Sequence, residues 1–217
     1  MNETRYFIYF LGVCFAILLL LIGSRWIFDL GPKTLAELHA ENYNKKSSDS
    51  NYIYNGFSFL KLHEPGTSTQ LWYTEYQKEG KIYAVALQYG PKELEYIPLE
   101  KINKSNSSLQ EVYLTFTPDK ENKAKPYLAQ AWYEISEKLV KILDLSPIAA
   151  CTENITSACA DRPIVSCDTV HDAVVIEFID APETKIVVHD NCIEVEGRDQ
   201  ELLKAANKLI YLFLDVV

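Results

Sequence analysis

The chain has 217 residues with a formal net charge of −9 at pH 7, and 48% of its residues are hydrophobic against 24% charged. This composition is ordinary for a globular protein and supplies enough apolar side chains for a core. The acidic balance argues against a nucleic-acid partner, because a phosphate backbone requires a clustered basic face. The lysine-rich stretch 120–125 follows Asp119 and is interrupted by Glu121, so it indicates a solvated loop.

The first element is an uncharged apolar run from Tyr6 to Gly23, which would be about 27 Å long as a helix. Residues as far as Phe28 can extend it across a hydrocarbon core of about 30 Å, and aromatic side chains stand near both ends. The pattern predicts a transmembrane anchor over residues 6–28, within an N-terminal segment 1–30. A cleaved signal peptide is the alternative, but the run is longer than is usual for one and no small-residue cleavage motif follows it.

Residues 31–51 are predicted to form a short helix and a polar linker. Thr34 and Glu37 have the spacing of a capping box, so a helix is expected to run to about Asn42. The polar remainder of this segment leads into a folded domain that we expect to span residues 52–217.

The folded domain is predicted to begin with strands. Asn55-Gly56 and Lys78–Lys81 each separate two runs of strand-forming residues, so each predicts a β-hairpin. Another strand is expected at Glu111–Thr117, where apolar and polar residues alternate. Pro126 then begins a helix at its preferred first position, and the apolar stripe of this helix ends before Pro147.

The second half repeats this order of elements. Strands are expected at Asp172–Ile179, Thr184–Val188 and Cys192–Glu196, and a helix over about Asp199–Val216. The first two strands are predicted to pair as a hairpin. We therefore predict an α+β fold, in which an N-terminal transmembrane helix is followed by an antiparallel-sheet domain with two long amphipathic helices. Two interpretations stay open: two diverged halves, 52–146 and 165–217, or one domain whose helices cover one face of the sheet.

Four of the five cysteines lie in the predicted folded domain: Cys151, Cys159, Cys167 and Cys192. An even number predicts two disulfides, and with them an oxidising compartment and a domain outside the cytoplasm. We prefer to pair Cys151 with Cys159 and Cys167 with Cys192, because the latter two flank the open end of the predicted hairpin. A zinc site is the alternative, but zinc thiolates usually come in more closely spaced pairs.

Several short motifs are shared with a group of known proteins. They are Leu71-Trp72-Tyr73-Thr74, Tyr89-Gly90-Pro91-Lys92-Glu93, Thr115-Phe116-Thr117-Pro118, Pro163-Ile164-Val165-Ser166-Cys167, Thr184-Lys185, Asn191-Cys192-Ile193 and Leu203-Lys204-Ala205-Ala206. On these motifs the chain resembles small single-pass, membrane-anchored archaeal proteins over roughly residues 50–215. The resemblance implies an exported, disulfide-bearing domain behind an anchor. The group has no assigned activity, so it implies no site residues.

Cys167 is a candidate nucleophile in one possible catalytic arrangement. Asp168 is adjacent and His171 lies four residues on, which would suit a nucleophilic Cys/His/Asp site. A disulfide to Cys192 would remove the thiolate that this chemistry needs. The sequence contains no G-x-S-x-G, H-E-x-x-H, G-x-G-x-x-G or Walker motif. It therefore predicts no catalytic residue and no cofactor.

A metal site is a second candidate at the open end of the predicted hairpin. His171 and Asp172 would lie across from His189 and Asp190, and two imidazoles with carboxylates can bind zinc or another divalent ion. The main candidates are His171, His189 and Asp190. The alternative is that these are partly exposed residues at strand ends with no bound metal.

The early strands are rich in aromatic residues, and the chain contains 14 tyrosines. Alternation places Trp72 and Tyr76 on one face of a strand and Tyr73 on the other. Exposed aromatic side chains suit recognition of a protein or a glycan, so these three form a candidate recognition surface. The alternative is that the rings pack in the core and pair across strands.

These observations lead to a hypothesis about function. The leading one is a membrane-tethered, extracytoplasmic recognition or scaffold module without catalysis. Its partners would be the membrane, through residues 6–28, and a protein or glycan outside the cytoplasm, with no nucleic acid. The alternatives are an envelope hydrolase or metal-dependent enzyme that uses the end with His171 and His189, and an accessory subunit of a membrane complex.

Overall fold

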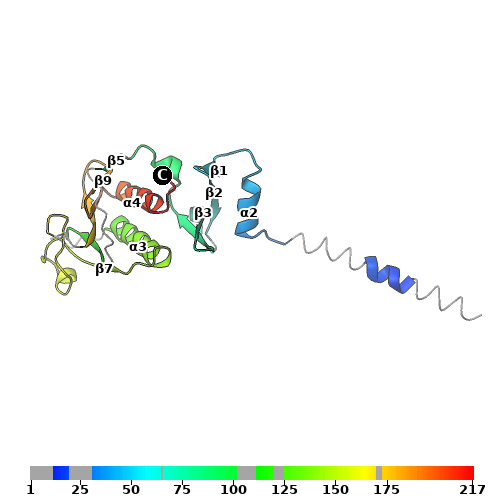
Figure 1. Ribbon diagram of the computed structural model, residues 1–217, viewed down its shortest axis with the longest axis horizontal. Coiled ribbons are helices and arrows are strands. Elements are labelled where there is room, and N and C mark those ends of the chain that lie inside the picture. The colour runs from blue at the N-terminus through cyan, green and yellow to red at the C-terminus, as the bar shows by residue number, and fades with distance from the viewer. Residues whose placement is uncertain (1–11, 20–30, 65, 102–110, 120–124, 170–172) are drawn as a thin grey trace, which may run out of the picture. The chain divides into compact units, whose positions relative to one another are not determined.

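The computed structural model describes residues 12–19, 31–64, 66–101, 111–119, 125–169 and 173–217. The chain divides into two units, Met1–Glu41 and Asn42–Val217. All strands in the described ranges belong to the second unit (Figure 1).

The prediction of a transmembrane helix is contradicted. Of the expected span 6–28, residues 6–11 and 20–28 lie outside the described residues, and residues 12–19 are helical. Within the described ranges, no helix combines the length and the apolar character that crossing a membrane requires. The single-pass placement in a membrane, which rested on that helix, is corrected with it.

Helix α2, Leu35–Asn42, begins at the predicted capping box. The Thr34 N–H donates to Glu37 Oε2 at 2.7 Å, and the Glu37 N–H donates to Thr34 Oγ1 at 3.3 Å. Each bond satisfies an N–H group that the start of a helix leaves without a backbone partner. Asn42, the last residue of the helix, opens the second unit, where its Nδ2 donates to Ser58 Oγ at 2.9 Å.

The first sheet is antiparallel throughout, in the order β1-β2-β3-β4. Its strands are β1 Asn51–Tyr54, β2 Phe57–His63, β3 Gln70–Lys78 and β4 Lys81–Leu87. Asn55-Gly56 and Glu79-Gly80 join the predicted hairpins, and all four residues have positive φ. A two-residue turn with that geometry matches the twist of the strands it connects.

The second sheet is mixed, in the order β5-β9-β10-β8-β6-β7. Its strands are β5 Leu99–Lys101, β6 Val112–Phe116, β7 Pro147–Ala149, β8 Val174–Asp180, β9 Lys185–His189 and β10 Cys192–Gly197. Only β9 and β10 pair antiparallel, and the other neighbours are parallel. The expectation of a wholly antiparallel domain therefore holds for the first sheet and not for the second.

The predicted hairpin of β8 with β9 is wrong for a specific reason. A tight turn at Asp190-Asn191 folds β10 back onto β9, with Asp190 at φ 48°. The other edge of β10 pairs in parallel with β8, so β10 lies between the two strands expected to pair. Because β6 also pairs with β8, strands from both of the halves considered above form a single sheet.

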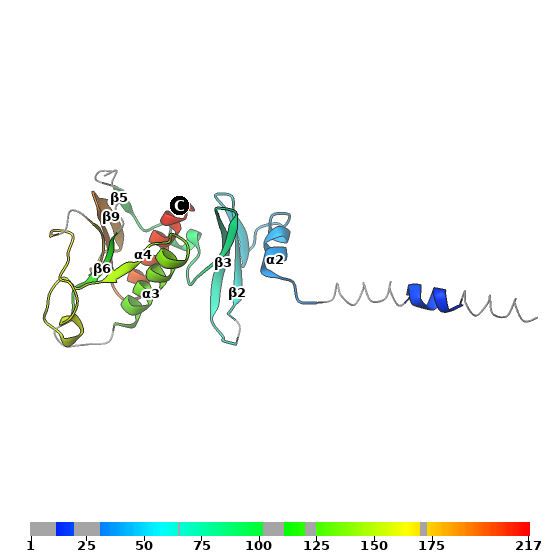
Figure 2. The ribbon, with the colours of Figure 1, turned by 60° about the horizontal axis from the view of Figure 1, so that its bottom comes forward.

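Two helices lie between the two sheets (Figure 2). α3, Pro126–Lys141, connects the parallel neighbours β6 and β7, and α4, Gln200–Phe213, follows β10. Short 3-10 turns occur at η1, Pro91–Leu94, and η2, Ser157–Cys159. Tyr211 of α4 is fully buried, packs edge-on against Phe59 with ring centroids 5.6 Å apart, and donates to the Tyr89 carbonyl at 2.9 Å. The helices therefore share one core with both sheets.

Candidate functional site

Three parallel strands of the second sheet end at the same edge, which we call the carboxyl edge. β6 ends at Phe116, β8 at Asp180 and β10 at Gly197, and their register brings these ends together. α3 and α4 begin just beyond this edge, at Pro126 and Gln200. In open sheets with parallel strands, ligands bind beyond the carboxyl ends of the strands. The carboxyl edge is therefore the first place to look for a site.

A cavity of about 360 Å³, which we call the edge pocket, lies at the carboxyl edge. Its walls come from the end of β6, the first turns of α3, and the loop that follows Cys151. The apolar wall includes Phe116, Leu128 and Trp132, and the charged wall is Asp119, Lys125 and Arg162. Three separate chain segments thus combine apolar and charged side chains around one hollow.

The loop that supplies the third wall is tied to the sheet. A disulfide joins Cys151 to Cys159 with their Cα atoms 6.0 Å apart, one of the two pairs that we preferred from the sequence. Thr115 Oγ1 donates to the Val165 carbonyl at 2.7 Å, and the Val165 N–H donates to the Cys151 carbonyl at 2.9 Å. The cross-link and these hydrogen bonds fix the position of Arg162 relative to β6.

Cations outnumber anions around the edge pocket. Asp180 accepts from Arg198 Nε at 2.9 Å and pairs with Lys125 Nζ at 3.2 Å. The hydrogen bond from Arg198, together with Lys125, holds the pKa of Asp180 below its ordinary value. Arg162 is exposed and makes no ion pair with any residue that the structure describes. Among the described residues, no side-chain hydrogen bond caps the start of α3 at Lys125, so the partial positive charge of the helix N-terminus adds to these cations.

The backbone at this edge is under constraint. Asp199, immediately before α4, has φ 51° and ψ −123°, a region that only glycine adopts readily. Gly197 has φ 156°, and a Cβ atom placed there would lie 2.8 Å from the Leu202 amide nitrogen. Such strain costs about 1–3 kcal/mol per residue and is concentrated at functional sites. A smaller cavity of about 60 Å³ is lined by both residues and shares Lys125 with the edge pocket.

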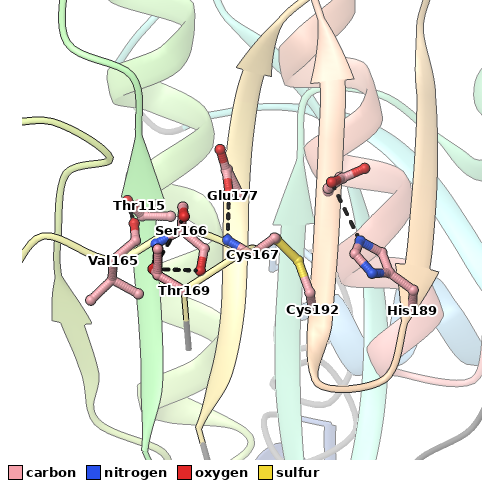
Figure 3. The surroundings of a disulfide bond; sticks show 9 residues. Thr115, Val165, Ser166, Cys167, Thr169, Glu177, His189 and Cys192 are labelled. Atoms are coloured by element: carbon pink, nitrogen blue, oxygen red, sulfur yellow. Dashed lines mark hydrogen bonds and ion pairs between the residues drawn. A yellow bond between two sulfur atoms is a disulfide. The ribbon is translucent and has the colours of Figure 1, made fainter. Parts of the chain in front are cut away.

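The opposite edge of the same sheet carries a second group of side chains (Figure 3). The Cys167–Cys192 disulfide, the other preferred pair, joins the loop before β8 to the first residue of β10, with Cα atoms 5.5 Å apart. His189 Nε2 lies 3.3 Å from Glu194 Oε1, and one ligand atom from each of these four residues lies within 4.8 Å of the others. We call Cys167, His189, Cys192 and Glu194 the amino-edge cluster.

Glu177 on β8 lies beside this cluster, as the register partner of Glu194. Its Oε2 accepts the Cys167 N–H at 2.9 Å, which positions the loop that carries the disulfide. Burial raises the pKa of Glu177, and the negative charge of the neighbouring Glu194 raises it further, while the Cys167 N–H opposes this shift. Two carboxylates therefore stand side by side next to the disulfide.

The aromatic recognition surface does not form as expected. Trp72 is only 3% exposed, its ring centroid lies 4.8 Å from that of Tyr52, and its Nε1 donates to Glu93 Oε2 at 2.6 Å. It belongs to the core, because its face of β3 packs into the apolar cluster shared with the helices. Tyr73 and Tyr76 are half-buried, and Tyr76 also packs against the core.

The nucleophile and metal candidates are only partly brought together. Cys167 is bonded to Cys192 and so has no thiolate, and His171 and Asp172 lie outside the described residues. His189 does lie among potential metal ligands, but its neighbours are the two cysteines and Glu194. Asp190 sits in the exposed turn between β9 and β10.

Sequence reasoning missed Glu194 and the edge pocket. Glu194 could have been found, because alternation along the strand places it on the same face as Cys192. The edge pocket could not, since Trp132 and Arg162 meet only through the path of the chain between β6 and β8. No protein-family model, no curated protein and no solved structure matches this chain.

Proposed function

We propose that the chain is a recognition module without catalysis, which binds a small anionic ligand with an apolar body in the edge pocket. The observation that carries the proposal is the position of this cavity, beyond the carboxyl ends of parallel strands and at the start of a helix. Its volume of about 360 Å³ falls in the range of cavities that hold small molecules. The size favours a small molecule or the end of a peptide over an extended protein surface.

The charges of the edge pocket favour an anion. Lys125 is already paired with Asp180, but Arg162 stands exposed with its guanidinium unpaired among the described residues. A guanidinium offers a planar fork of donors that matches a carboxylate or a phosphate. The uncapped first turn of α3 adds backbone N–H groups and a partial positive charge. Asp119 on the same wall would disfavour a second negative charge on the ligand.

The apolar wall favours a ligand with a flat or aliphatic body. Phe116, Leu128 and Trp132 are each only half-buried, so part of each side chain is exposed toward the cavity. Covering apolar surface contributes about 25 cal/mol per Å², and an aromatic ring stacked on Trp132 would add to that. The described lining contains no histidine, cysteine or serine beside a base, so the proposal assigns no reaction to this pocket.

Anilinonaphthalene sulfonate is a suitable probe, because it combines an anionic group with an aromatic body. We expect saturable fluorescence enhancement on the folded chain. Arg162→Gln should weaken binding about 10-fold, the typical effect of losing one charge-assisted hydrogen bond. Lys46→Gln, which removes an exposed positive charge elsewhere, is the matched control.

A second variant tests the cavity itself. Ala129 lines the edge pocket from the exposed side of α3, so Ala129→Trp should fill the cavity and abolish binding without removing a charge. Probe binding that is unaffected by both Arg162→Gln and Ala129→Trp would place the probe elsewhere and refute the proposal. Near-ultraviolet circular dichroism checks that each variant keeps its tertiary packing.

A further inference from the structure

The amino-edge cluster has the composition of a zinc site in which two ligands are joined to each other. It contains two sulfurs, one imidazole and one carboxylate, and in the described part of the chain no other group of this kind occurs. Zinc in proteins is bound by these ligand types in tetrahedral geometry. His189 lies on β9, and Cys192 and Glu194 lie on the adjacent strand β10. Cys167 lies in the loop before β8, and Figure 3 shows it bonded to Cys192.

The fold places three of the four ligands by strand register. Cys192 pairs directly with His189 across the β9–β10 ladder, so their side chains lie on the same face. Glu194 follows two residues later on β10 and shares that face. The fourth ligand, Cys167, is held by its N–H bond to Glu177 on β8, the register partner of Glu194. None of these constraints depends on the disulfide itself.

We propose that reduction of the Cys167–Cys192 disulfide converts the amino-edge cluster into a four-ligand Zn²⁺ site. A thiol reductant supplies two electrons and two protons: the S–S bond breaks, two cysteine thiols form, and the reductant leaves as its own disulfide. Zn²⁺ then displaces one proton from each thiol and takes His189 and Glu194 as its remaining ligands. Oxidation by a disulfide-containing acceptor reverses both steps and releases the metal.

The geometry needs only a short movement. Bonds of about 2.3 Å to sulfur at the tetrahedral angle place two zinc-bound sulfurs about 3.8 Å apart, compared with about 2.0 Å in a disulfide. The sulfurs must therefore separate by less than about 2 Å, which rotation about the two Cα–Cβ bonds can supply. The His189 and Glu194 ligand atoms already lie within 4.8 Å of both sulfurs.

The charges around the cluster also favour a cation after reduction. Glu177 and Glu194 are adjacent on neighbouring strands, and Asp168 lies close enough to act on Glu177. Two thiolates beside these carboxylates would repel them strongly at low local dielectric. A divalent ion offsets this repulsion, whereas the oxidised disulfide, which is neutral, does not need one.

The other disulfide offers a matched control. The full 217-residue chain carrying Cys14→Ser is treated with a phosphine, which takes up oxygen from water as it reduces disulfides, and is then titrated with Co²⁺ as a spectroscopic substitute for zinc. We expect a single equivalent of Co²⁺ per chain with the intense visible bands of a tetrahedral thiolate complex. Cys151→Ser/Cys159→Ser should keep these bands, and Cys167→Ser/Cys192→Ser should lose them. The untreated, oxidised chain should show none.

The two remaining ligands are tested singly in the reduced chain. His189→Ala should weaken Zn²⁺ binding at least about 10-fold, the lower end of what even outer-sphere partners contribute. Glu194→Gln should weaken it less, because water can replace a carboxylate as fourth ligand. Three outcomes would each overturn the proposal: equal Co²⁺ spectra with and without Cys167 and Cys192, no metal uptake after reduction, or loss of the near-ultraviolet circular dichroism on reduction.

Discussion

The two edges of the six-stranded sheet differ in how the chain closes them. At the carboxyl edge, β6 and β10 end in loops that lead to α3 and α4. The edge pocket there is open and is bordered by cations and by the start of α3. At the amino edge, the chain returns from loops into strands, and a disulfide holds the returning loop against β10. The carboxyl edge therefore borders an open pocket, whereas at the amino edge a disulfide ties the loop before β8 directly to a strand. The carboxyl edge is suited to binding a ligand, and the amino edge to a change of covalent state.

The largest expected effect distinguishes the disulfides of the two edges. Cys167 and Cys192 are 25 residues apart, whereas Cys151 and Cys159 are 8 apart. Loop-closure entropy predicts that Cys167→Ala/Cys192→Ala lowers the free energy of unfolding by about 3.5 kcal/mol and Cys151→Ala/Cys159→Ala by about 2.5 kcal/mol. Urea denaturation without reductant measures both. The reverse order would show that the pocket loop contributes more to stability than its length implies.

Gly197 tests the backbone of the carboxyl edge. Gly197→Ala puts a Cβ atom 2.8 Å from the Leu202 amide nitrogen, at a φ of 156° that residues with side chains rarely adopt. We therefore expect a loss of at least about 2 kcal/mol in unfolding free energy. Gly80→Ala is the control: its φ is 77°, but no atom lies within 4 Å of the added Cβ, so about 1 kcal/mol is expected. Equal thermal shifts for the two variants would mean that the close approach to α4 is relieved at little cost.

A change in the helix layer should leave both edges intact. Glu134 on α3 accepts hydrogen bonds from Gln130 and from the buried Asn207, and burial raises its pKa against these bonds. Between the ordinary carboxyl pKa and this raised value, the folded chain binds more protons than the unfolded chain, so stability falls as pH rises through that interval. Glu134→Gln should remove this slope and cost about 1 kcal/mol for one lost hydrogen bond.

The measurement for Glu134 is urea unfolding at a series of pH values. The difference in stability between the wild type and Glu134→Gln should shrink as pH rises through the interval, because only the wild type loses stability there. Parallel pH curves would contradict the raised pKa. Co²⁺ uptake and probe binding should be the same in both proteins.

The smallest effect concerns the ion pairs at the carboxyl edge. Arg198→Gln should let the pKa of Asp180 rise toward its ordinary value, since the Arg198 hydrogen bond is the main cause that lowers it. The lowered pKa of Asp180 adds to the free energy of unfolding at pH values above the ordinary carboxyl pKa. This added stability is lost as the pH falls through the lowered pKa. A carbon-detected NMR titration of Asp180 measures the shift, which added salt should reduce. Arg162→Gln should leave the Asp180 titration unchanged.

Local signals in the sequence predicted much of the fold. Asn55-Gly56 marks a turn, Thr34 with Glu37 caps a helix, and Pro126 begins α3. Each depends on residues a few positions apart. The order of strands in the second sheet could not be obtained this way. The alternation of apolar and polar residues along β8, β9 and β10 shows that they are strands, but it does not show which strands will pair.

The candidate sites show the same limit. The preferred disulfide pairs agree with the structure. Alternation along β3 could not tell which face would be covered, so Trp72 stayed a candidate for a recognition surface or for the core, and it lies in the core. An apolar run of sufficient length predicted a membrane span, whereas no helix among the described residues is long and apolar enough to cross a membrane. The resemblance to small archaeal membrane-anchored proteins stays a prediction.

The position of β10 between β8 and β9 sets the order in which the molecule can be completed. β8 and β9 are synthesised first, yet they do not pair with each other, and the edge that each presents to β10 stays unpaired until residues 192–197 emerge. α4, which packs against both sheets, emerges later still. A ribosome-bound chain halted before Cys192 therefore displays unpaired strand edges and an open core, which is the state that chaperones bind during translation. The second sheet can therefore be completed only after β10 has been made, and the shared core only after α4.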